Sequence, residues 1–169
     1  MAEEIINRVA NNQNLMTFDL EEYYPDGNRV LFDIKDWLFE GLLLREKDFR
    51  KHVKDHNWSQ YQNQYVALTC STEAIIPGWA YLLLTSSLIP YAKKVVVGSL
   101  ETLETILYEE LINTLDVSAY QDKLLIIKGC TQKPVPEGAY IALIQKLQPV
   151  AKSLMYGEAC SAVPLYKRR

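Results

Sequence analysis

Three cysteines offer the clearest chemistry in this chain of 169 residues, because each comes at the end of a run that favours a β-strand. Cys70 follows residues 65–69, Cys130 follows residues 124–129, and Cys160 follows residues 155–159. In an open α/β sheet, ligands bind beyond the carboxyl ends of the strands. If these strands run parallel in one sheet, three thiols arrive at one edge of it. The spacing therefore predicts a ligand site at that edge.

A zinc site is one interpretation of these thiols, since zinc prefers thiolate and imidazole ligands in tetrahedral sets. Cys70, Cys130 and Cys160 would supply three thiolates, and His56, just before the first core strand, is the best fourth ligand. The thiols are far apart in the sequence and lack the close Cys-x-x-Cys pairs that make zinc motifs specific. Three separate core thiols are therefore the alternative, because free cysteine is among the most buried residue types.

A reactive thiol is the next interpretation. Cys70 directly precedes Ser71 and Thr72, which are favourable N-cap residues for a helix. A thiol at a helix N-terminus ionises more readily than a free one. With His56 as its base, Cys70 would be the nucleophile of a thiol-dependent enzyme. The chain has neither a Gly-x-Cys-x-Gly elbow nor a close cysteine pair, so catalysis stays an alternative to binding.

The charge of the chain argues against a nucleic-acid partner. The formal net charge is −3, whereas nucleic acids attract basic surfaces. The basic stretch 51–54 is typical of a solvated helix face, and Lys167-Arg168-Arg169 is typical of a frayed basic end. Glycine-rich phosphate-binding motifs are absent from the sequence. We expect a small-molecule ligand of unidentified class.

One uncharged stretch, residues 74–92, approaches the length of a membrane span. Pro77, Gly78 and Pro90 interrupt it, so a helix buried in a globular core is the better prediction. The acidic N-terminus lacks the long apolar segment of a secretory signal. Three widely spaced cysteines give no sign of an oxidising compartment. We expect a cytoplasmic protein without membrane contact.

The elements that must position these residues alternate from residue 65 onward. Short β-branched runs and amphipathic or buried helices follow one another in the order β-α-β-α-β-α-β. This order predicts an α/β fold, a single domain with a mostly parallel sheet flanked by helices. We expect residues 58–169 to form the core and residues 1–57 to form an N-terminal extension packed on it. Internal repeats are not expected.

Within the extension, residues 15–20 and 29–33 are predicted to be strands, paired around a proline- and glycine-containing turn. The first forty residues are expected to add an antiparallel edge strand to the sheet. A run of large apolar residues comes next: Trp37, Leu38, Phe39, Leu42, Leu43 and Leu44. One face of a strand or helix buries only part of such a run. We expect a homodimer, with back-folding of the extension as the other use of this surface.

Three longer stretches are distinctive: Val30 to Phe39, Cys70 to Tyr81, and Gly157 to Lys167. Together they resemble an uncharacterised bacterial family, domain of unknown function 2480, over nearly the whole chain. The resemblance implies a small stand-alone bacterial protein and brings no established activity or catalytic residues. The residues themselves favour a binding protein with a strand-end site. A cysteine-dependent enzyme and a structural protein with buried cysteines are the alternatives.

Overall fold

The computed structural model describes residues 15–129, 132–158 and 161–169 of the chain. These residues form two compact units, each with its own sheet and hydrophobic core. Unit 1 consists of the residues up to Pro25 together with Thr105–Arg169, and unit 2 is the continuous segment Asp26–Glu104. In the sequence, unit 2 is therefore inserted into unit 1.

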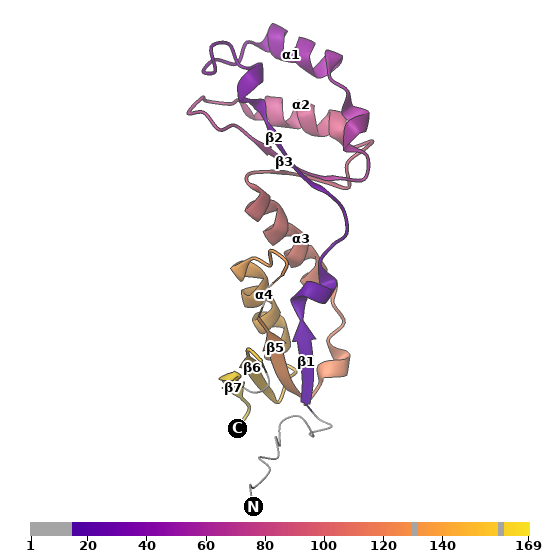
Figure 1. The fold of residues 1–169 in the computed structure, drawn as a ribbon, viewed down its shortest axis with the longest axis vertical. Coiled ribbons are helices and arrows are strands. Elements are labelled where there is room, and N and C mark those ends of the chain that lie inside the picture. The colour runs from indigo at the N-terminus through magenta and orange to yellow at the C-terminus, as the bar shows by residue number, and fades with distance from the viewer. Residues whose placement is uncertain (1–14, 130–131, 159–160) are drawn as a thin grey trace, which may run out of the picture. The chain divides into compact units, whose positions relative to one another are not determined.

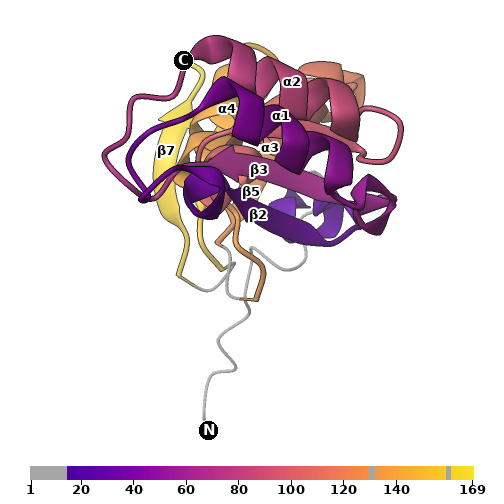
Figure 2. The same ribbon diagram turned by 90° about the horizontal axis from the view of Figure 1, so that it is seen from above.

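Unit 2 is a three-stranded parallel sheet with two helices on one face. The strand order is β2-β3-β4, and both pairs are parallel. Figures 1 and 2 show α1 and α2 side by side on the same side of these strands. The elements are β2 (Arg29–Asp33), β3 (Tyr65–Thr69), β4 (Lys94–Val97), α1 (Glu46–Asp55), α2 (Gly78–Leu88) and the short 3-10 helices η2 (Ile34–Trp37) and η3 (Trp58–Tyr61).

The core of unit 2 follows from the spacing of its apolar residues. Val66 and Leu68 are two residues apart in β3, so they point to the same face of the sheet, and both are fully buried. Helix α2 covers that face with aliphatic residues at four-residue spacing, which places them on one side of the helix: Ala80, Leu84 and Leu88. The uncharged stretch predicted to be a core helix thus forms one.

Unit 1 has a four-stranded sheet in the order β1-β5-β6-β7, in which only β7 is antiparallel to its neighbour. Its core joins Leu125, Ile127 and Leu154 of the strands to Leu143 and Leu147 of one helix. Helix α3 crosses from unit 2 into unit 1. The elements are β1 (Leu15–Asp19), β5 (Leu124–Lys128), β6 (Ser153–Tyr156), β7 (Val163–Lys167), α3 (Leu100–Thr114), α4 (Glu137–Leu147), η1 (Leu20–Tyr23) and η4 (Ser118–Tyr120).

The two units repeat one structure. The series α1-η3-β3-α2-β4 in unit 2 matches the last part of α3 followed by η4-β5-α4-β6 in unit 1. A constant shift of 59 positions aligns them without a gap, as for Tyr61 and Tyr120 (120 − 61 = 59). Identical residues recur from Ser59 onward, among them Ser59/Ser118, Tyr61/Tyr120, Gln62/Gln121, Pro77/Pro136, Ala80/Ala139, Tyr81/Tyr140, Leu84/Leu143, Leu88/Leu147, Pro90/Pro149, Ala92/Ala151, Lys93/Lys152 and Gly98/Gly157.

Backbone geometry supports this repeat independently. Asn63 and the aligned Asp122 both have a φ of 59°. The amide of Asn63 donates to the carbonyl of Tyr91, the amide of Asp122 donates to that of Val150, and both bonds measure 2.9 Å. The edge strands also correspond, because β1 and β2 end in the same Phe-Asp pair. The chain is an internal duplication, and the expectation that it has no repeat is wrong.

The α/β class with mostly parallel strands flanked by helices is confirmed. Three finer expectations are wrong. The parallel strands form two sheets rather than one. The strands β1 and β2 do not pair with each other, and each is a parallel edge strand rather than an antiparallel one. The connection between the two strands is not a tight turn, because Asp19 caps the 3-10 helix η1 directly after β1. This helix leads the chain away from a hairpin.

None of the helices in the described ranges is long and apolar enough to cross a membrane. Helix α2, which lies within the uncharged stretch 74–92, has 11 residues. A membrane-spanning helix needs roughly 20 apolar residues. The described helices therefore offer no span.

Candidate functional site

The carboxyl edge of the unit 2 sheet gathers polar side chains from three elements. Asp33 ends β2, the segment 70–72 follows β3, and Tyr81 comes from the first turns of α2. We call Asp33, Cys70, Ser71, Thr72 and Tyr81 the strand-end cluster. Parallel strands bring their carboxyl ends to one edge, which is where α/β sheets bind ligands.

Asp33 links the ends of β2 and β3. Its Oδ1 accepts hydrogen bonds from the amides of Lys35 at 3.0 Å and of Ser71 at 3.1 Å. Burial alone would raise the pKa of Asp33, but hydrogen bonds from Ser71 and Lys35 outweigh it, so the pKa lies below its ordinary value. The carboxylate is therefore ionised at neutral pH and acts as an acceptor.

Cys70 and Tyr81 add two weak acids beside this carboxylate. The Cys70 Sγ lies 3.3 Å from Thr72 Oγ1 and 3.7 Å from the Thr72 carbonyl oxygen, to which the thiol donates. The pKa of Tyr81 is raised, first by burial and then by the nearby acidic groups Cys70 and Asp33. The cluster thus presents a thiol, a phenol, hydroxyls and one carboxylate. These groups can donate and accept hydrogen bonds.

Comparison with unit 1 shows which residues at the carboxyl edge of the unit 2 sheet are common to both units. Asp19, the counterpart of Asp33, likewise caps a 3-10 helix by accepting from the Glu21 amide at 2.9 Å. It is paired with Lys128 at 3.0 Å, whereas the lysine near Asp33 in unit 2 is Lys35, whose Nζ lies 3.9 Å from Asp33 Oδ2. The counterpart of Cys70 is Gly129 (129 − 70 = 59). The aspartate is thus a shared structural cap, whereas the cysteine differs in position: unit 1 has glycine at the place of Cys70 and Cys130 at the place of Ser71.

The thiol cluster was predicted on the condition that the strands before the three cysteines share one sheet, and they do not. Cys70 follows β3 in the unit 2 sheet, while the strands before Cys130 and Cys160 lie in the unit 1 sheet. Cys130 and Cys160 themselves lie outside the described residues. Among the described residues, no group of three His, Cys, Asp or Glu side chains is suited to hold a metal ion. The zinc site of Cys70, Cys130, Cys160 and His56 stays a prediction.

His56, the predicted fourth ligand or catalytic base, lies in an aromatic cluster of unit 2. Its ring contacts those of Phe32, Trp37, Trp58 and Tyr61 at centroid distances of 4.7–5.7 Å. The Nε2 atom lies 2.9 Å from the Tyr61 hydroxyl. In the described part of the chain, the polar contacts of His56 go to Tyr61 and Gln60 and not to Cys70. The pairing of a Cys70 nucleophile with a His56 base also stays a prediction.

Sequence reasoning missed Asp33 and Tyr81. The internal repeat was the signal that identifies them. Aligning the Phe-Asp pairs that end β1 and β2 singles out Asp33, and aligning Ala80-Tyr81 with Ala139-Tyr140 singles out Tyr81. Both residues have counterparts in unit 1, Asp19 and Tyr140.

Comparison with known proteins identifies the family alone. A family model described as "Protein of unknown function (DUF2480)" matches residues 3–168, and the chain belongs to this family. Neither the curated proteins nor the solved structures yield a match.

Proposed function

We propose that this member of the family is a small-molecule binding protein whose ligand is held by the strand-end cluster of unit 2. The observation that carries the proposal is the bond from the Ser71 amide to Asp33, which joins the ends of β2 and β3 next to Cys70, near enough to Tyr81 for Asp33 and Cys70 to raise its pKa. A ligand there meets an ionised carboxylate as acceptor, and a phenol and a thiol as donors. A small polar molecule with hydrogen-bond donors suits this set.

The comparison of the two units favours the thiol as a ligand contact. The fold tolerates glycine at the position of Cys70, as Gly129 shows in unit 1. Cys70 is only partly exposed, and its thiol is engaged with Thr72. A ligand that displaces this weak internal bond would bury the sulfur.

Thiol labelling tests the proposal without knowing the ligand. Ellman's reagent is applied to the native protein with and without a mixture of polar metabolites, and the labelled cysteine is identified by mass spectrometry. We expect the mixture to slow labelling of Cys70, and Tyr81→Phe to abolish that protection. Tyr140→Phe, the matched change in unit 1, should leave it intact. Equal labelling of Cys70 in all conditions would contradict the proposal.

Elemental analysis of protein purified without added metal separates the binding modes. Stoichiometric zinc, together with release of several thiols by a chelator, would establish the predicted metal site. Protein free of metal that still shows ligand-dependent protection of Cys70 supports the hydrogen-bonding site proposed here.

A further inference from the structure

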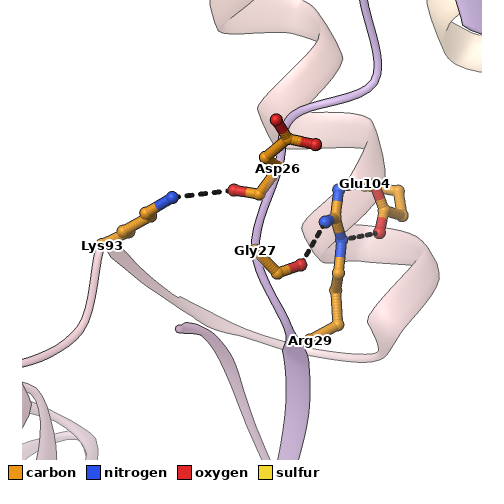
Figure 3. Close-up of polar contacts among 5 residues, drawn as sticks. All are labelled: Asp26, Gly27, Arg29, Lys93 and Glu104. Atoms are coloured by element: carbon orange, nitrogen blue, oxygen red, sulfur yellow. Dashed lines mark hydrogen bonds and ion pairs between the residues drawn. The ribbon is translucent and has the colours of Figure 1, made fainter. Parts of the chain in front are cut away.

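Equivalent lysines in the two units have different surroundings. In unit 2, the Nζ of Lys93 donates to the carbonyl oxygen of Asp26 at 2.8 Å (Figure 3). It also lies 5.4 Å from the centre of the Tyr65 ring. In unit 1, the equivalent Lys152 (152 − 93 = 59) lines an open hollow of about 360 Å³. The fold therefore does not require the Lys152 ammonium to make the internal bond that Lys93 makes.

The hollow is lined by Asp122, Lys152, Arg168 and Arg169. Its one carboxylate, Asp122, is already bound to the guanidinium of Arg168. Within the described residues, the side-chain cations of Lys152 and Arg169 have no hydrogen-bond partner. The lining side chains thus carry three positive charges and one negative charge, and the carboxylate of Asp122 interacts with both Arg168 and Lys152. The side chains of the hollow have an excess of positive charge.

Arg168 is held in place rather than frayed, contrary to the expectation for this basic end. Its NH2 donates to the carbonyls of Pro149 at 3.0 Å and Val150 at 3.1 Å. Its main-chain amide donates to the Lys152 carbonyl at 2.9 Å. These bonds fix the base of the hollow, so the entropy cost of ordering it for a ligand is already met.

We infer that this hollow binds the phosphate group of a small molecule, held by Lys152 and Arg169 over the fixed Arg168. Lysine and arginine are the usual partners of phosphate, and charge-assisted hydrogen bonds to it are stronger than neutral ones. The size of the hollow suits a small ligand. The aligned position of Asp122 in unit 2 is Asn63, so the acidic anchor of Arg168 is particular to unit 1.

Nuclear magnetic resonance titration with inorganic phosphate tests the inference. In low-salt buffer we expect saturable shifts of the amides of residues 122, 152 and 168. Lys152→Ala and Arg169→Ala should each weaken binding about tenfold, the factor that corresponds to a lost interaction of about 1.4 kcal/mol. Lys167→Ala removes the same charge from the neighbouring residue, which lines a different hollow, and should leave the affinity unchanged.

Vesicles containing phosphatidic acid form a second arm, since a lipid headgroup carries the same chemistry. Lys152-dependent shifts with phosphate and no cosedimentation with the vesicles identify a soluble ligand. Lys152-dependent cosedimentation identifies a headgroup. The inference is overturned if phosphate produces no saturable shifts, or if Lys167→Ala weakens binding as much as Lys152→Ala.

Discussion

At the scale of the residue, the surroundings of His56 favour one of its two charge states. Four aromatic rings contact the imidazole, and the carbonyl of Val53 beside it is occupied by the Trp58 indole at 2.8 Å. Burial lowers the pKa of His56 below its ordinary value of 6.5. The neutral ring is thus the form that the folded protein prefers.

This preference makes stability depend on pH. Because the folded-state pKa of His56 is below 6.5, the unfolded chain binds the proton more tightly. The contribution of His56 to the free energy of unfolding is present above pH 6.5 and is lost as the pH falls toward the folded-state pKa. Urea unfolding at a series of pH values measures the loss. His56→Gln should flatten the dependence between neutral and mildly acidic pH, whereas the control His52→Gln should keep it. An unchanged slope in His56→Gln would argue against this role.

At the scale of the element, an ion pair ties the start of α3 to β2 in unit 2. Arg29 Nε donates to Glu104 Oε1 at 2.6 Å, and its NH2 donates to Oε2 at 3.2 Å (Figure 3). The two side chains are only 11% and 7% exposed. Both charges are therefore largely removed from water, and each depends on the other.

Replacing one partner of this pair should lower the free energy of unfolding more than replacing both. Arg29→Met leaves the Glu104 carboxylate buried without its partner, so we expect a loss of about 3–5 kcal/mol in the free energy of unfolding. The double variant Arg29→Met/Glu104→Leu should regain much of that loss, because it leaves no lone charge. Denaturant unfolding of the three proteins decides. A double variant as unstable as Arg29→Met would show that the hydrogen bonds, and not the uncompensated charge, dominate.

The glycines that end β4 and β6 give a matched pair of element-scale changes. Gly98 has a φ of +140° and Gly157 has a φ of +116°. Residues other than glycine rarely adopt such values. A Cβ at Gly98 would lie 2.8 Å from Thr102 Oγ1, whereas the nearest atom to one at Gly157 is 3.6 Å away. Thr102 cannot easily retreat, because its amide donates to the Ser99 hydroxyl at 3.1 Å.

Alanine should therefore be tolerated less well at Gly98 than at Gly157. We expect Gly157→Ala to cost about 1–2 kcal/mol from backbone strain, and Gly98→Ala to cost more because the clash adds to the strain. Thermal unfolding of both variants gives the comparison. Equal losses would mean that Thr102 adjusts freely.

At the scale of the whole molecule, unit 2 is a continuous segment of the chain with its own hydrophobic core. Asp26–Glu104 contains all three strands of its sheet, both covering helices and the Arg29–Glu104 pair. We expect this segment, expressed alone, to give an α/β circular dichroism spectrum and cooperative unfolding. Residues 105–169 alone lack β1, which pairs with β5, and should not unfold cooperatively. Non-cooperative melting of Asp26–Glu104 would show that unit 2 needs unit 1.

The apolar run of unit 2 divides between its core and its surface. Trp37 and Leu44 pack on the core, but Leu42 and Leu43 remain 66% and 56% exposed. We expect this surface to form the predicted homodimer, so light scattering should give about twice 19.4 kDa. Leu42→Asp should reduce the mass to that of one chain, whereas Ile141→Asp, at the similarly exposed Ile141 of α4, should not. A mass near 19.4 kDa for the unaltered protein would show that it is a monomer and that these residues form no dimer interface.

The sequence by itself determined the local structure of this protein. Apolar runs such as 65–69 and the amphipathic pattern of α3 predicted the strands, the helices and the α/β class, because periodicity depends on near neighbours. Cys70 was correctly placed at a strand end for the same reason. The repeat was also present in the sequence, but its weak identities stand out only when equivalent elements are aligned.

Only the tertiary structure decided how the strands are divided between the two sheets. β3 and β5 are both buried apolar strands, and nothing in their local pattern says that they belong to different sheets. The choice rests on pairing with β2 and β1, which lie far away in the sequence, and such long-range contacts are not encoded by periodicity. That choice put the strand before Cys70 in a different sheet from the strands before the other two cysteines, and in the same sheet as β2, whose Asp33 accepts a hydrogen bond from the neighbouring Ser71.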